Sequence, residues 1–289
     1  MGRRPPSTHG LAVVDKPAGV TSHDVVAMLR RRFGERQVGH AGTLDPDATG
    51  VLLVGVGRCT RLLRFLTDLG KAYTGQVVFG STTDSLDSTG QVTGTYDMAG
   101  LTPQRVQAEI DAHLVGDILQ VPPMVSAVKV DGRRLHELAR EGVEVERAPR
   151  PVRVYRFTAS ATADPLVYDI EVACSKGTYV RTLADDLGRL CGGGAHLRGL
   201  RRVSVGGFTS AQSAPPDSVQ LLSLTEAVRD YPTVTVTPET AAQVANGRVL
   251  PSFEGQGPWA VVDEGGHLLA MYEAAGGDRA KPAVVVPQG

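Results

Sequence analysis

Residues 38–56 read VGHAGTLDPDATGVLLVGV, and the stretch changes character in its middle. Residues 38–50 are dense in glycine, histidine and aspartate and show neither helical nor strand periodicity. Residues 51–56 are an apolar run of the length expected for a buried strand. Polar loops set directly against a core strand often carry functional side chains. This loop is therefore the first candidate for a site.

Asp45 lies at the centre of the loop. An ionised aspartate on a glycine-rich backbone can act as a nucleophile or as a general base. An Asp-Pro pair also favours an ordinary Asx-turn, and composition alone favours that interpretation. Residues 45–49, DPDAT, also match the D-x-D-x-T pattern of aspartyl-phosphate hydrolases, which use Mg²⁺. That pattern should close a long apolar strand, whereas here it follows RQVGH, so we attribute the match to chance.

The chain before this loop predicts a strand at 11–15, a turn at 16–19 and a helix. Thr21 is the predicted N-cap of the helix, Asp24 its capping-box partner, and Gly34 its end. Arginines cluster where this helix ends, at positions 30, 31, 32 and 36. Cations there interact favourably with the helix dipole, so capping explains the cluster as well as contact with a polyanion does.

The remaining elements are predicted from periodicity and turn signals. Strands are expected at 73–80, 91–96, 152–157 and 166–174, and helices at 59–69, 102–114 and 178–191. Residues 121–150 are proline-containing and then highly charged, which predicts a mobile surface arm. A boundary is expected within 209–232. After it, Val/Thr strands alternate with glycine turns and predict a small all-β appendage.

Composition sets the class of protein. With 289 residues, 42% of them hydrophobic, the chain suits one large globular domain, or one large and one small. No run approaches the roughly 20 apolar residues of a membrane span, and no signal peptide is evident, so we expect a cytoplasmic protein. Its three cysteines are widely spaced and lack a C-x-x-C pair, which favours buried reduced thiols over disulfides or zinc. Residues 1–72 carry 11 Lys and Arg against 6 Asp and Glu, which permits a local polyanion site.

Several segments occur together and in a fixed order. They are VDKPAGVTS (14–22), GHAGTLDPDATGVLLVGVGRCT (39–60), KAY (71–73), CSKGTYVRTL (174–183) and GAHLRGLRR (194–202). This set resembles the motifs of the bacterial tRNA pseudouridine-55 synthases, the TruB family. An ordered set is far more specific than any single motif. The resemblance covers roughly residues 11–208.

The resemblance implies a fold and a division of the chain. The fold would be α+β, with a mixed, largely antiparallel sheet flanked by helices and a small C-terminal all-β PUA-like domain. Residues 1–232 would form the catalytic domain, in which 121–150 is a mobile RNA-contacting insertion. Residues 233–289 would form the PUA-like domain.

The resemblance also implies roles in catalysis. Asp45 would be the catalytic carboxylate, and Arg181 would pair with it and keep it ionised. Tyr73 would stack on the flipped uracil. The remaining residues expected to bind or shape the uracil pocket are His40, Tyr179, Leu200, Lys16 and Pro17. His40 would fill the space that the extruded base leaves.

Arginines and lysines near these motifs are expected to meet RNA phosphates. The candidates are Arg58, Arg61, Lys129, Arg133, Arg201 and Arg202, with Arg64, Arg134 and Arg198 near them. The expected partner is the T-arm stem-loop of tRNA. RNA is usually read through shape, unstacked loops and backbone. By the same resemblance the protein would be a monomer.

The implied reaction isomerises a uridine of the T-loop to pseudouridine by moving the glycosidic bond from N1 to C5. Uracil and ribose supply every atom, so no cofactor or metal is expected. Two routes stay open: addition of the carboxylate to the base, or deprotonation of the sugar. A tRNA-folding chaperone of the same fold is the alternative function, which the presence of Asp45, Tyr73 and Arg181 argues against.

Overall fold

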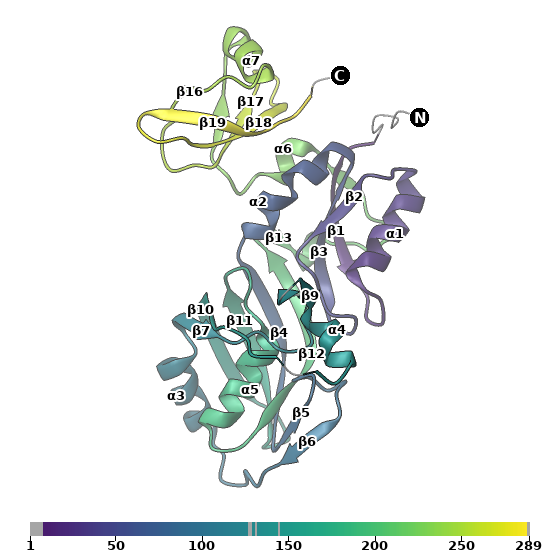
Figure 1. Ribbon diagram of the computed structural model, residues 1–289, viewed down its shortest axis with the longest axis vertical. Helices are drawn as coiled ribbons and strands as arrows, with labels where there is room; N and C mark the ends of the chain where they lie inside the picture. The colour runs from purple at the N-terminus through teal and green to yellow at the C-terminus, as the bar shows by residue number, and fades with distance from the viewer. Residues whose placement is uncertain (1–7, 127–128, 131, 144, 288–289) are drawn as a thin grey trace. The chain divides into compact units, whose positions relative to one another are not determined.

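The computed structural model describes residues 8–126, 129–130, 132–143 and 145–287 (Figure 1). The chain divides into two compact units, which we describe separately. The first unit comprises Met1–Pro46, Gly50–Asp68 and Val205–Gly289. The second comprises Asp47–Thr49 and Leu69–Ser204.

The first unit is built around the strand that the polar loop precedes. β3 (Thr49–Val56) pairs antiparallel with β1 (Gly10–Lys16) and with β2 (Val38–Ala41), and β1 also pairs with β14 (Leu221–Leu222). The side chains of 51–54 are fully buried, as their apolar run predicts. The prediction that residues 38–41 belong to the loop is wrong, because they form β2. A four-residue strand is too short to show periodicity, and it forms here because β3 offers it a partner.

Helix α1 (Ser22–Phe33) follows β1 and confirms its predicted ends. The Thr21 side chain accepts a hydrogen bond from the Asp24 backbone N–H, and the Asp24 carboxylate accepts one from the Thr21 N–H. Gly34 adopts the left-handed conformation, φ 60°, that ends a helix most cheaply in a residue without Cβ. The predicted helix at 59–69 is a 3₁₀ turn, η1 (Gly57–Leu62), continued by α2 (Leu63–Asp68).

The C-terminal part of the first unit forms a separate five-stranded sheet in the order β15-β17-β18-β19-β16. Its strands are β15 (Thr233–Thr235), β16 (Leu250–Pro251), β17 (Trp259–Val262), β18 (Leu268–Ala274) and β19 (Arg279–Val285). Trp259 and Tyr272 are buried, and Phe253 meets both rings edge-on. The expectation of an all-β appendage is wrong in one respect, because α7 (Pro238–Ala245) packs on this sheet. Thr237 caps that helix and Pro238 starts it, a local signal that the sequence analysis passed over.

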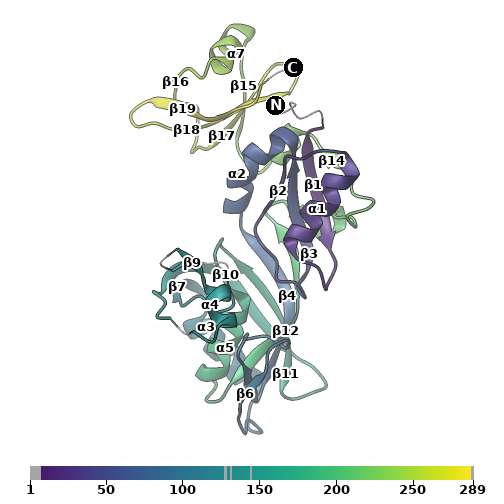
Figure 2. The ribbon, with the colours of Figure 1, turned by 45° about the vertical axis from the view of Figure 1, so that its right-hand side comes forward.

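The second unit has strands in the order β12-β4-β11-β10-β7 (Figure 2). They are β4 (Lys71–Phe79), β7 (Gly116–Gln120), β10 (Arg150–Ala161), β11 (Val167–Cys174) and β12 (Ala195–Val205). Strands β4, β11, β10 and β7 pair antiparallel. Helices α3 (Pro103–His113) and α5 (Val180–Leu190) lie within two residues of their predicted bounds. β5 (Ser81–Thr83) and β6 (Val92–Thr95) form a small hairpin sheet.

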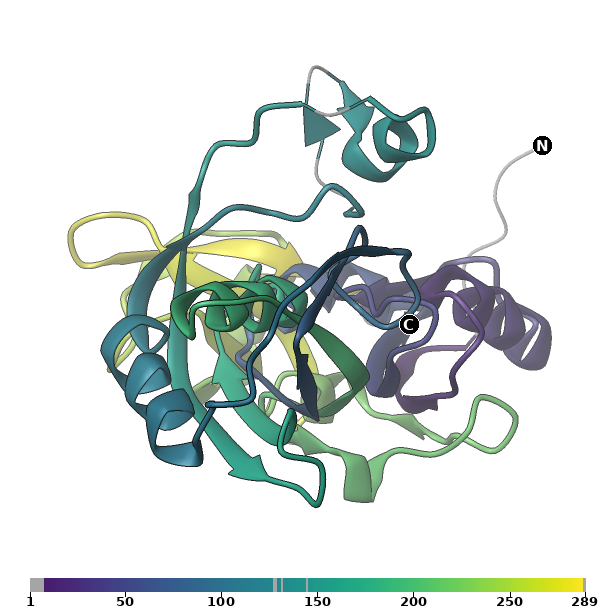
Figure 3. The ribbon, with the colours of Figure 1, turned by 90° about the horizontal axis from the view of Figure 1, so that it is seen from below.

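The arm at 121–149 leaves the second unit between β7 and β10. It contains β8 (Lys129–Val130), β9 (Arg133–Arg134) and α4 (Leu135–Arg140). In Figure 3 the arm, in teal, projects from the sheet on the two chain segments that join it to β7 and β10. The arm therefore has secondary structure of its own within its described residues.

The three cysteines are free and buried, which confirms that interpretation of their spacing. Burial raises the pKa of the Cys59 thiol to about 12, and those of Cys174 and Cys191 to about 11.

Because the thiolate is the reactive form, the native protein should react with a thiol reagent at mildly alkaline pH at least about tenfold more slowly than the unfolded chain. Titration with Ellman's reagent, with and without guanidinium chloride, measures this. The unfolded chain should release one chromophore for each of its three cysteines. Rapid labelling of any thiol in the native protein would contradict the burial.

Candidate active site

Asp45 is half-buried in the loop between β2 and β3. The residue before it, Leu44, is held by the hydroxyl group of Ser22. Ser22 Oγ, buried at the start of α1, accepts a hydrogen bond from Leu44 N (3.0 Å) and donates one to Leu44 O (3.2 Å). A single side chain therefore satisfies both polar groups of that peptide position. The result is that α1 positions the loop just before Asp45.

The residue after Asp45 is fixed from the other side by Lys16. The side chain of Lys16 is fully buried, and its Nζ donates to the carbonyls of Pro17 (2.9 Å), Val20 (2.6 Å) and Pro46 (2.8 Å). The Gly19 N–H also donates to Pro46 O (3.0 Å). Lys16 thus supports the backbone beside Asp45, which gives its expected supporting role a physical form.

Two further predicted residues of the first unit lie near this loop. His40, on β2, is half-buried and meets the ring of His23 edge-on, with 5.3 Å between centroids. Pro17 borders an apolar groove of about 700 Å³. The other residues that line this groove are Met28, Arg31, Arg32, Pro215, Pro216 and Asp217.

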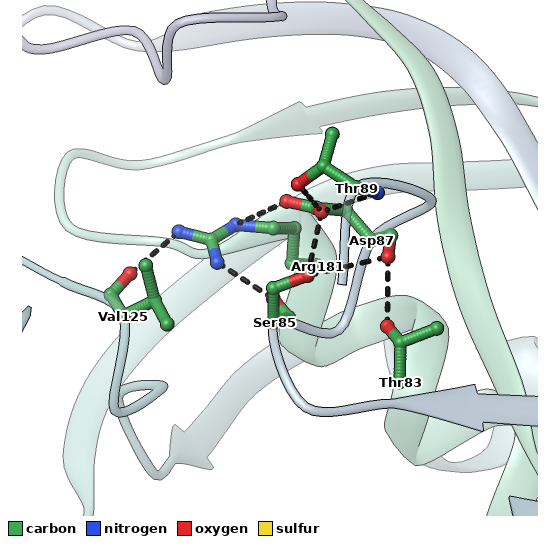
Figure 4. A network of polar contacts seen from close by, with 6 residues as sticks. All are labelled: Thr83, Ser85, Asp87, Thr89, Val125 and Arg181. Carbon is green, nitrogen blue, oxygen red and sulfur yellow. Dashed lines mark hydrogen bonds and ion pairs between the residues drawn. The ribbon is translucent and has the colours of Figure 1, made fainter. Parts of the chain in front are cut away.

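Arg181, in the first turn of α5, is 3% exposed and is held by the backbone of its own unit. Its Nη1 donates to Ser85 O (2.7 Å), its Nη2 donates to Val125 O (2.8 Å), and its Nε lies 3.7 Å from Asp87 Oδ2 (Figure 4). These contacts fix the plane of the guanidinium. Tyr73, on β4 opposite Val172 of β11, is 8% exposed.

Asp87 faces Arg181 and was not among the predicted site residues. Its carboxylate accepts hydrogen bonds from Ser85 Oγ (2.7 Å), Thr89 N (3.0 Å) and Thr89 Oγ1 (2.6 Å), besides facing Arg181. Residues 81–90 lie between the strands predicted at 73–80 and 91–96 and show no periodicity of their own. The available signal was the Asp-Ser-Thr run at 87–89, which is typical of an Asx-turn. Nothing local shows that such a turn faces a buried arginine.

The other residues expected in the uracil pocket, Tyr179 and Leu200, are both half-buried in the second unit. Tyr179 directly precedes α5, and Leu200 lies on β12. Asp45 belongs to the first unit, whereas Tyr73, Arg181, Tyr179 and Leu200 belong to the second. The pairing of Asp45 with Arg181 therefore stays a prediction.

The candidate RNA-contact cations differ in what they touch. Arg58 Nη1 donates to Pro287 O (2.6 Å) and Arg61 Nη1 to Val285 O (2.6 Å), both in the C-terminal segment of the first unit. Arg133 is exposed and paired with Glu141. Lys129 lies on β8 in the arm.

Two candidates from β12 differ in exposure. Arg201 contacts Thr49 Oγ1 (3.4 Å) and lines a polar pocket of about 430 Å³. Arg202 is only 1% exposed, so a phosphate at the surface could not reach its guanidinium, and we withdraw it as an RNA contact.

Two negative observations apply only to the part of the chain that the structure describes. No three His, Cys, Asp or Glu side chains gather there as they would around a metal ion. Among the same residues, no helix is both long and apolar enough to cross a lipid bilayer.

Comparison with known proteins places this site in a family. Residues 30–180 match the model described as "TruB family pseudouridylate synthase (N terminal domain)". The chain belongs to the TruB family. Two further models match the residues that follow, "tRNA pseudouridylate synthase B C-terminal domain" at 181–233 and "tRNA Pseudouridine synthase II, C terminal" at 231–287. The resemblance drawn from the motifs is thereby confirmed.

TruB relatives match over nearly their whole length. The tRNA pseudouridine synthase B of Rhodococcus jostii is 45% identical over 288 residues, which cover 96% of this chain and 94% of that protein. The protein of the same name from Corynebacterium aurimucosum is 46% identical, covering 92% of this chain and 93% of its own.

Solved structures of the same fold confirm the α+β architecture with its large sheet and C-terminal β region. A Cbf5-Nop10-Gar1 complex contains a chain that superposes with a TM-score of 0.73 at 23% identity, covering 96% of this TruB chain and 84% of that one. An H/ACA RNP bound to a substrate RNA that contains 2′-deoxyuridine gives a TM-score of 0.71 at 21% identity, covering 96% of this chain and 85% of that one.

The three carbonyls that Lys16 binds lead to a prediction about stability. Lys16→Met keeps the length and the apolar stem but removes every donor, so the carbonyls of Pro17, Val20 and Pro46 lose their hydrogen bonds from Nζ, and Pro46 O keeps the one from Gly19 N. We expect the free energy of unfolding to fall by about 2–3 kcal/mol, measured by urea denaturation. Lys281→Met, at an exposed position of β19, is the control and should be close to neutral. Equal stabilities for the two variants would show that the Lys16 contacts contribute nothing.

Proposed function

We propose that this chain is a tRNA pseudouridine synthase that isomerises uridine 55 in the T-loop of tRNA. The observation that carries the proposal is the 45% identity to the tRNA pseudouridine synthase B of Rhodococcus jostii across 96% of the chain. The placement of Asp45 supports it, since a catalytic carboxylate must be held still and remain accessible. Both neighbours of Asp45 are clamped while its own side chain stays half-buried.

The reaction breaks the bond between C1′ and N1 and forms one between C1′ and C5. C5 loses its proton to solvent and N1 gains one, so atoms and electrons balance without an oxidant. The target base must first be flipped out of the folded loop, at a cost of a few kcal/mol. Stacking on the Tyr73 ring offsets that cost by roughly 1–3 kcal/mol. The carboxylate of Asp45 then acts by addition to the base or by deprotonation of the sugar.

In this proposal Arg181 keeps the Asp45 carboxylate ionised and oriented, since an adjacent guanidinium favours the charged form. Asp87 balances the charge of Arg181 and helps to fix its plane, which makes Asp87 a positioning residue. Tyr179 and Leu200 line the uracil pocket, and His40 occupies the gap that the flipped base leaves. The partner is the T-arm of tRNA, and Lys129 and Arg133 of the arm are its candidate phosphate contacts.

Tritium release from C5-labelled uridine in a T-arm stem-loop tests this function, with EDTA present. Asp45→Asn should lower the rate by on the order of 10⁴-fold, since it removes the reacting charge. RNA affinity should be largely kept. Asp47→Asn, at an exposed position two residues along, is the matched control and should react within about threefold of wild type. Absence of release by wild type would reject the function, and equal rates for the two variants would reject Asp45.

Arg181→Lys tests the need for a planar, multidentate cation. Lysine keeps the charge but cannot reproduce contacts to Ser85 O, Val125 O and Asp87 at once. We expect single-turnover tritium release to fall by roughly 100-fold. Arg189→Lys, an exposed position of the same helix, should have little effect. Near-normal turnover by Arg181→Lys would remove Arg181 from the mechanism.

A further inference from the structure

Gln120 lies where the arm leaves the sheet. It is the last residue of β7 and pairs in register with Arg150, the first residue of β10. The chain between them is the arm. Although it lies at a strand end, its side chain is only 2% exposed. A buried amide must find a donor and an acceptor within the protein, so its partners are informative.

Those partners both belong to the backbone of one residue, Tyr179. Gln120 Nε2 donates to Tyr179 O (3.0 Å), and Gln120 Oε1 accepts from Tyr179 N (2.7 Å). The amide therefore binds Tyr179 through two hydrogen bonds, as a neighbouring strand would. Tyr179 is the N-cap position of α5 and has no side-chain capping bond of its own. Gln120 thus ties the end of β7 to the start of α5.

A second contact joins the same two segments. Arg181, two residues after Tyr179, donates through Nη2 to Val125 O, five residues into the arm. The root of the arm (residues 120–125) is therefore bonded at both ends to the first turn of α5. That turn carries the two residues expected to line the uracil pocket and to orient Asp45.

We propose that Gln120 is a positioning residue for the isomerisation: its amide locks the root of the arm to Tyr179 and so holds the Tyr179 ring and the Arg181 guanidinium where catalysis needs them. This rests on the proposed function. Gln120 itself contacts no reacting atom. Its loss should therefore lower the rate of the chemical step more than the affinity for RNA.

The need for one donor and one acceptor gives the proposal a distinctive test. In Gln120→Glu the ionised carboxylate can accept from Tyr179 N but cannot donate to Tyr179 O. The protonated carboxyl has the shape of the amide and supplies both. The guanidiniums of Arg181 and Arg147, bound to Val125 O and Pro122 O, are the charged groups held by this root. The missing donor returns once the pH falls far enough to protonate the introduced carboxyl.

The second unit contains a matched control. Gln107, on α3, makes a similar bridge to β10, donating to Phe157 O (3.3 Å) and accepting from Ala159 N (3.1 Å), and its Nε2 also donates to Asp111 Oδ1 (2.8 Å). Gln107→Glu therefore imposes the same loss of a donor within the second unit and in addition brings a carboxylate against Asp111. It touches neither Tyr179 nor the root of the arm. Gln120→Met, which has similar length but no polar group, supplies a variant whose defect cannot titrate.

The experiment measures single-turnover tritium release from a C5-labelled T-arm stem-loop between mildly acidic and mildly alkaline pH, with RNA affinity and thermal unfolding alongside. At alkaline pH we expect Gln120→Glu to react about tenfold more slowly than wild type with affinity within about threefold. Relative to wild type, this deficit should shrink as pH falls. The deficit of Gln120→Met should be the same at every pH, and Gln107→Glu should follow wild type.

Three outcomes would overturn the proposal: wild-type rates for Gln120→Glu across the range, a deficit that Gln107→Glu shares, or a rate loss that the unfolded fraction at the assay temperature accounts for. A wild-type protein that releases no tritium would instead reject the proposed function, so the two failures are distinguishable.

Discussion

A buried ammonium that must be satisfied by carbonyl oxygens shapes the first unit. Lys16 ends β1 with no exposed surface, and three backbone carbonyls turn toward its Nζ. The three hydrogen bonds from Nζ fix the turn after β1 at Pro17, the segment before α1 at Val20 and the loop before β3 at Pro46. Because an unpaired buried charge is costly, separating any of these segments from Lys16 costs free energy. A fully buried ammonium thus holds the backbone beside the half-buried carboxylate of Asp45.

In the second unit, too, buried polar side chains bind the backbone of irregular segments. Arg181 and Gln120 direct their polar atoms at main-chain groups of Ser85, Val125 and Tyr179. Irregular segments around a site cannot satisfy their backbone in a ladder, and buried peptide groups need partners. The long polar side chains of Arg181 and Gln120 supply those partners. Rigid placement of polar groups is one way in which a protein lowers the barrier of a reaction.

The sequence predicts well those features that depend on residues close by in the chain. The cap of α1 and its terminal glycine follow from local chemistry, and the ordered motifs identify the family. The sequence does not predict those features that depend on a segment far away in the chain. β2 exists because β3 lies beside it, Asp87 matters because Arg181 faces it, and Arg202 is buried although its sequence neighbours are exposed or partly so. The pairing of Asp45 with Arg181 depends on how the two units meet, which local patterns do not specify.

The arginines of the segment 57–68 have a consequence for how this protein responds to ionic strength. Arg58 and Arg61 bind neutral carbonyls of the C-terminal segment, and Arg64 pairs with Glu273. Salt screens charge–charge attraction, but it weakens a hydrogen bond to a carbonyl far less. Cations that meet RNA phosphates would release counterions and lose affinity steeply as salt rises. Arg58 and Arg61 therefore keep their positive charge at the surface while their hydrogen bonds hold the C-terminal segment, and added salt leaves those hydrogen bonds largely intact.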